Sequence, residues 1–91
     1  MNNDYRGMSV SAIKELVKNT DKNIVAIAKP YCGSFLQGQG YILNIVDGDK
    51  VFIVASYRSN MKLYKRADAL LNDAHDMGLT SVRFDFEPNK N

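Results

Sequence analysis

Two stretches of the chain carry apolar side chains at the spacing of an amphipathic helix. Residues 10–18 are apolar on one face and carry lysine and glutamate on the other. Ser9, directly before them, is a residue type that caps helix N-termini. Residues 66–77 repeat the pattern, and Gly78 follows where a left-handed residue commonly ends a helix. The apolar positions of this second helix are Ala67, Leu70, Leu71, Ala74 and Met77. Its predicted solvent face carries Asp68, Asn72, Asp73, His75 and Asp76.

The region between the two helices has the pattern of antiparallel strands. Asp47-Gly48 separates two apolar runs, and this dipeptide is a strong hairpin signal because two-residue turns need positive φ. With Asp47-Gly48 as the turn, Leu43 lies opposite Phe52. A second turn at Ser59-Asn60 sets Ala55 opposite Tyr64. The predicted meander has two apolar faces, one with Leu43, Phe52, Val54, Met61 and Leu63, the other with Ile42, Val46, Val51, Ile53, Ala55, Tyr57 and Tyr64. We expect helices or a partner subunit to cover both faces.

Two shorter segments complete the prediction. Residues 24–28 are rich in β-branched side chains, and Lys29 precedes Pro30, so a strand is favoured. The alternative is a second helix, which would form a helix-turn-helix with the first. Residues 81–86 alternate as a strand with Val82, Phe84 and Phe86 pointing inward.

These elements indicate a small α+β single domain over residues 1–91. Its predicted order is an N-terminal amphipathic helix, an antiparallel three-stranded meander, a second amphipathic helix and a C-terminal strand. Residues 1–8 and 87–91 are expected to be flexible. A chain of 91 residues buries only a small core.

Composition and charge narrow the class of protein. The formal net charge is +2 at pH 7, so only the distribution of charge argues for nucleic acid. One cysteine, Cys32, excludes an intrachain disulfide and indicates a reducing compartment, for which we expect the cytoplasm. The apolar runs are far shorter than the roughly 20 residues of a membrane span, so no membrane partner is expected.

Candidate catalytic and cofactor residues are few. Cys32 and the single histidine, His75, show no relation along the chain that would activate a thiolate. Asp73 and Asp76 on the second helix supply too few ligands for a metal. Glycines in residues 31–40 precede a strand, whereas a phosphate-binding loop precedes a helix and a Lys-Ser/Thr pair. The sequence therefore predicts no enzyme, no cofactor and no metal site.

The strongest candidate for binding is the segment 57–66, which carries four cations and two tyrosines without an acid. Aromatic rings beside cations can stack on bases and pair with phosphates. The alternative is an edge strand whose lysines prevent sheet-to-sheet pairing. The predicted site residues are Tyr57, Arg58, Lys62, Tyr64, Lys65 and Arg66.

Residues 41–77 resemble the arm-type DNA-binding domains of tyrosine recombinases. The shared features are three strands, a basic aromatic strand and an Ala- and Leu-rich helix entered through Tyr64-Lys65-Arg66-Ala67-Asp68-Ala69. Such domains lay their sheet in the DNA major groove, so the resemblance implies DNA as a partner. The chain departs from the pattern in its preceding helix, its strand at 82–86 and the acidic surface of its second helix.

The sequence thus supports two functional hypotheses. The first is a small non-enzymatic regulatory module that contacts nucleic acid through the basic hairpin. The second is a protein–protein interaction module or stoichiometric inhibitor of the kind found among accessory proteins of mobile elements, with a homodimer as one form. A nucleic acid and an acidic protein surface are both partners that four clustered cations would suit.

Overall fold

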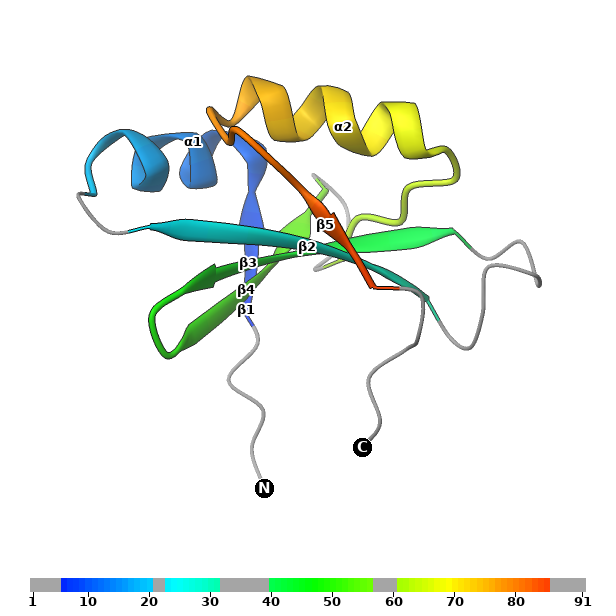
Figure 1. Ribbon diagram of the computed structural model, residues 1–91, viewed down its shortest axis with the longest axis horizontal. Helices are drawn as coiled ribbons and strands as arrows, with labels where there is room; N and C mark the ends of the chain where they lie inside the picture. The colour runs from blue at the N-terminus through cyan, green and yellow to red at the C-terminus, as the bar shows by residue number, and fades with distance from the viewer. Residues whose placement is uncertain (1–5, 21–22, 32–39, 57–60, 86–91) are drawn as a thin grey trace.

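In the part of the chain that the structure describes, five strands form one mixed sheet and two helices lie on one side of it (Figure 1). The computed structural model describes residues 6–20, 23–31, 40–56 and 61–85. The elements are β1 (Arg6–Ser9), α1 (Val10–Lys18), β2 (Ile24–Pro30), β3 (Tyr41–Asp47), β4 (Lys50–Ala55), α2 (Ala67–Asp76) and β5 (Arg83–Phe84). The α+β class is confirmed, but the three-stranded antiparallel meander is wrong.

The sheet has the order β1-β4-β3-β2-β5, so β3 is its central strand. β3 pairs antiparallel with β4 and with β2, whereas the edge strands β1 and β5 pair parallel with β4 and β2. A strand at the position of β1 is not predicted from the sequence. The prediction of a strand from residue 24 is confirmed, and the helix-turn-helix alternative is wrong.

α1 begins and α2 ends on the expected chemical signals, whereas Arg66 makes no side-chain capping bond at the start of α2. The Ser9 hydroxyl accepts a hydrogen bond from the Ala12 amide at 3.1 Å, which caps α1 over the predicted range. Gly78 follows α2 with φ +89°, the left-handed conformation expected there. Of the predicted apolar face of α2, Leu70, Ala74 and Met77 are buried. Leu71 is 45% exposed, so the buried stripe is narrower than predicted.

The hairpin between β3 and β4 turns one residue later than predicted. Asp47 pairs with Lys50, and Gly48 is the first loop residue with φ +65°. Ile45 therefore lies opposite Phe52, where the prediction set Leu43. The later turn shifts the pairing of β3 with β4 by two residues. Because side chains alternate between faces with a period of two, each residue still lies on its predicted face.

The predicted third strand of the meander does not form. The edge of β4 that it was expected to pair with is taken by β1. The Lys62 amide instead donates to the Val54 carbonyl at 2.8 Å, and Tyr64 exchanges two backbone hydrogen bonds with Tyr41. Segment 61–64 thus lies between the ends of β4 and β3. The resemblance to arm-type domains depended on the missing strand. The turn at Ser59-Asn60 falls outside the described residues.

The hydrophobic core lies between the sheet and the helices. Its buried members are Ile13, Ala26, Ala28, Leu43, Ile45, Val54, Tyr64, Leu70, Ala74 and Met77. Val82 and Phe84 pack against this core as expected, although β5 has two residues where six were predicted. Phe86 lies outside the described residues. Tyr64, predicted on the opposite face with Ile42, is a core residue because segment 61–64 crosses between the strands.

Neither described helix is long and apolar enough to cross a membrane.

Candidate functional site

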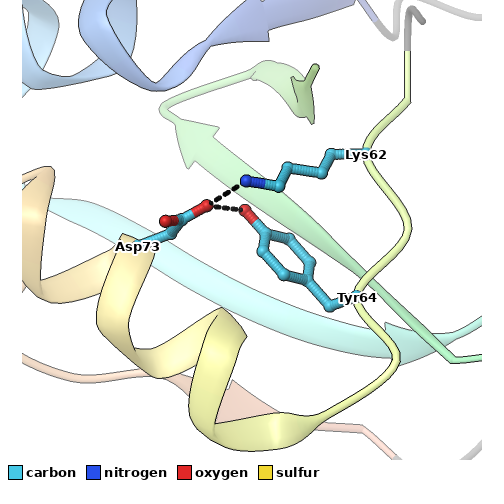
Figure 2. A network of polar contacts seen from close by, with 3 residues as sticks. All are labelled: Lys62, Tyr64 and Asp73. Carbon is cyan, nitrogen blue, oxygen red and sulfur yellow. Dashed lines mark hydrogen bonds and ion pairs between the residues drawn. The ribbon is translucent and has the colours of Figure 1, made fainter.

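Two features of the described residues are candidates for function, and the first is a polar cluster at the predicted basic segment. Lys62 and Tyr64 point from segment 61–64 toward Asp73 on α2 (Figure 2). The Lys62 ammonium lies 2.7 Å from Asp73 Oδ2, and the Tyr64 hydroxyl donates to the same oxygen at 2.6 Å. The Lys62 ammonium also lies 5.0 Å from the centre of the Tyr64 ring, within range of a cation–π contact.

Burial makes this cluster mainly a structural one. Tyr64 is only 3% exposed. Burial first, and then the hydrogen bond to Asp73, raise the pKa of the Tyr64 hydroxyl far above its ordinary value, so it stays protonated and donating. A ring held in the core cannot stack on a nucleotide base. Asp73, which sequence analysis placed on the solvent face, ties α2 to segment 61–64.

The remaining cations of the predicted site are not gathered around that cluster. Lys65 and Arg66 are exposed at the entry to α2. The Arg66 guanidinium pairs with Asp68 at 3.0 Å, and this contact raises the pKa of Arg66 and lowers that of Asp68. Tyr57 and Arg58 lie outside the described residues. The structure therefore brings Lys62 and Tyr64 together and leaves Lys65 and Arg66 on the surface.

Residues considered for catalysis show no joint arrangement in the described ranges. His75 lies on the rim of an open hollow of about 160 Å³ that Leu71, Leu79 and Val82 also line. Cys32 falls outside the described residues. No described group of three or more His, Cys, Asp or Glu side chains could hold a metal ion.

The second candidate is the sheet face turned away from both helices, here called the open face (Figure 1). The strand registers place on it six β-branched side chains of the three central strands: Val25, Ile27, Ile42, Val46, Val51 and Ile53. Ala55 and the charged Lys29 lie on the same face. None of the six packs against the core, and Val25 is 43% exposed. Among the described residues, no helix or strand covers this face. The open face is therefore an apolar surface without a described cover.

One polar side chain lies in the middle of the open face. Asn44 is only 3% exposed, and its Oδ1 atom has no hydrogen-bond partner among the described contacts. Its cross-strand neighbours are Ile27 on β2 and Ile53 on β4. A buried acceptor without a donor costs about 1–3 kcal/mol. Sequence analysis missed Asn44, although it is the only strongly polar residue within the apolar run 41–46.

Comparison of the chain with protein-family models, with curated proteins and with solved structures finds no match.

Proposed function

We propose that this chain is a protein-interaction module that binds its partner through the open face of its sheet. The observation that carries the proposal is the ring of four β-branched side chains around Asn44, a buried amide whose oxygen lacks a donor. Those four are Ile27, Ile42, Val46 and Ile53. Contiguous exposed apolar surface on a small domain marks an interaction site.

The size of the surface fits that role. With strands about 4.8 Å apart and about 3.3 Å per residue, three central strands of six or seven residues present roughly 300 Å². The largest apolar patch of a typical monomer is about 300–600 Å² and is often functional. The open face reaches this range, and most of its side chains on the three central strands are apolar, with Lys29 and Asn44 as the polar exceptions.

A lysine substitution at Val25 tests the proposal. Val25 is the most exposed apolar residue of the open face, so a lysine there leaves the core unchanged and places a charge on the surface. Leu71→Lys is the matched control, since Leu71 is equally exposed but lies on α2. We expect proteins that cross-link to the wild-type chain in host extract, identified by mass spectrometry, to be retained by Leu71→Lys and lost by Val25→Lys. An identical set of partners on all three would contradict the proposal.

Contact with nucleic acid through the basic segment stays a prediction. Within the described residues it is supported by the exposed neighbours Lys65 and Arg66. Digesting nucleic acid in a parallel extract separates the two hypotheses, because partners held by the open face persist and partners bridged by nucleic acid disappear.

A further inference from the structure

We propose that Asp73 on α2 is a built-in competitor that withholds the basic segment from nucleic acid. Its carboxylate occupies the place at the Lys62 ammonium that a phosphate oxygen of a nucleic acid would take (Figure 2). The inference goes beyond the proposed function and does not depend on the open face. It concerns residues 61–66, the part of the basic segment that directly precedes α2.

The core needs only one of the two bonds that Asp73 Oδ2 accepts. The Tyr64 hydroxyl is buried and must have an acceptor, which Asp73 supplies at 2.6 Å. The Lys62 side chain is 37% exposed, so water can solvate its ammonium without Asp73. The ion pair of 2.7 Å between Lys62 and Asp73 is therefore not required to satisfy a buried group. Its main effect is on Lys62, whose charge it neutralises.

The surrounding contacts hold the Asp73 carboxylate against Lys62. The Tyr64 hydroxyl fixes the same carboxylate oxygen from the core side, so Asp73 is already ordered when Lys62 pairs with it. The Lys62 ammonium also lies 5.0 Å from the centre of the Tyr64 ring. Pairing with an ordered partner loses less side-chain entropy than pairing between two mobile side chains. Lys62 is thus held more firmly than a lysine in an ordinary surface pair.

The other two cations of residues 61–66 are more available to a ligand. Lys65 and Arg66 are both exposed. Arg66 pairs with Asp68 at 3.0 Å, but the two side chains are 77% and 65% exposed, and such exposed pairs contribute little. A phosphate can therefore displace Asp68 from Arg66 more easily than it can displace Asp73 from Lys62. Asp73 is the acid that limits how many phosphates this part of the chain contacts.

The competition distinguishes a lone phosphate from a strand. An internal carboxylate acts at an effective concentration on the order of millimolar, so a phosphate at micromolar concentration does not displace it. A nucleic-acid strand also contacts Lys65 and Arg66, and each phosphate contact releases counterions. With Asp73 in place, residues 61–66 offer the strand two cations. Without the Asp73 charge they offer three.

Fluorescence anisotropy with a labelled single-stranded DNA of about 20 nucleotides tests the inference. Asp73→Asn removes the competing charge, and its amide oxygen can still accept from the Tyr64 hydroxyl. Asp76→Asn is the matched control, since it makes the same change in net charge at an exposed position of the same helix. We expect Asp73→Asn to bind the DNA at least about fivefold more tightly than Asp76→Asn at low salt, with a slope of log K against log salt that is steeper by about 0.7. Equal affinities and slopes of the two variants would overturn the inference.

A second substitution in the Asp73→Asn protein shows whether the gain in affinity comes from Lys62. Lys62→Ala should abolish the gain. Lys14→Ala, which removes the same charge from the exposed face of α1, should leave most of it. Equal losses would mean that the gain reflects net charge alone, and the inference would be wrong.

Amine labelling of the wild-type chain keeps the test decisive if Asp73→Asn does not fold, as judged by circular dichroism. An acetylating reagent modifies lysine side chains, and mass spectrometry measures the rate at each position. We expect Lys62 to be modified at least about threefold more slowly than the exposed Lys65, because Asp73 holds its ammonium. Equal rates would show that Lys62 is not withheld, which also overturns the inference.

Discussion

At the scale of single residues, Asp73 ties segment 61–64 to α2. One of its oxygens accepts from both Lys62 and the buried Tyr64 hydroxyl. We expect Asp73→Ala to lower the free energy of unfolding by about 2 kcal/mol, because the Tyr64 hydroxyl loses its acceptor inside the core. Urea denaturation at pH 7 measures this, with Asp76→Ala as control. Asp76 is exposed on the same helix, so its removal should cost less than about 0.5 kcal/mol. Equal losses would contradict the role assigned to Asp73.

Tyr64 also gives the fold a dependence on alkaline pH. The pKa of its hydroxyl is raised in the folded state by burial and by Asp73, whereas an unfolded tyrosine ionises near pH 10. Above that pH the unfolded chain releases a proton that the folded chain retains. The contribution of Tyr64 is therefore complete below about pH 10 and is lost as pH rises, by about 1.4 kcal/mol per unit.

The variant Tyr64→Phe isolates this contribution from the other groups that titrate at high pH. Phenylalanine cannot ionise, so the stability advantage of the wild type over Tyr64→Phe should be nearly constant up to about pH 9 and should shrink above about pH 10. Urea denaturation of both proteins across this range measures the gap. A gap that stays constant would show that Tyr64 is not buried and bonded as described.

At the scale of elements, the entry of segment 61–64 between β3 and β4 depends on Gly40. A Cβ atom at this position would lie 2.5 Å from the Tyr64 carbonyl oxygen, and Gly40 has φ +106°. We expect Gly40→Ala to destabilise the fold by about 3 kcal/mol, since it combines a backbone clash with an unfavourable conformation. Gly48→Ala is the control: its φ is +65°, but no atom lies within 4 Å of the added Cβ, so only a conformational cost of about 1–2 kcal/mol remains. Thermal or urea unfolding compares the stabilities of the two variants. Equal losses of stability would mean that segment 61–64 does not pack closely against Gly40.

The elements that sequence patterns predict well are those whose signals are local. The cap at Ser9 and the stop at Gly78 act within a few residues, and both helices form where these signals set them. The paired faces of β3 and β4 also follow from alternation. The parallel strand β1 was missed because its four residues carry no alternation and its partner β4 lies more than 40 residues later in the chain.

The candidate sites also combine features that the sequence predicts with features that only the packing of the fold reveals. The basic composition of segment 57–66 is plain in the sequence, but the pairing of Lys62 with Asp73 depends on how α2 packs over segment 61–64. The crossing of segment 61–64 moves Tyr64 from the expected surface into the core. Asn44 is visible in the sequence as one polar residue in an apolar strand. Its central position becomes clear only once β3 is known to be the middle strand.

At the scale of the whole molecule, the two helices among the described residues cover one face of the sheet. α1 and α2 both lie over the core face (Figure 1), and the strand registers place the β-branched side chains on the opposite face. A domain of this length gains little stability from a single core. Burial of the open face against a partner would therefore add to the stability of the fold. We expect the resistance of the chain to unfolding to rise with the concentration of that partner.

The prediction of nucleic-acid binding depends on which cations of the basic segment are exposed on the surface of the molecule. Of the basic segment's described residues, Lys62 is tied to Asp73 and the Tyr64 ring is in the core. We therefore expect Lys65→Ala with Arg66→Ala to weaken retention on DNA and RNA at low salt no more than a pair elsewhere that removes the same charge. Lys14→Ala with Lys18→Ala on the exposed face of α1 is that control. Equal losses indicate attraction by net charge alone, because each phosphate contact releases its counterion independently of sequence. A loss of threefold or more confined to the first pair would instead locate a nucleic-acid interface at the entry to α2, and would contradict the open face as the main binding surface.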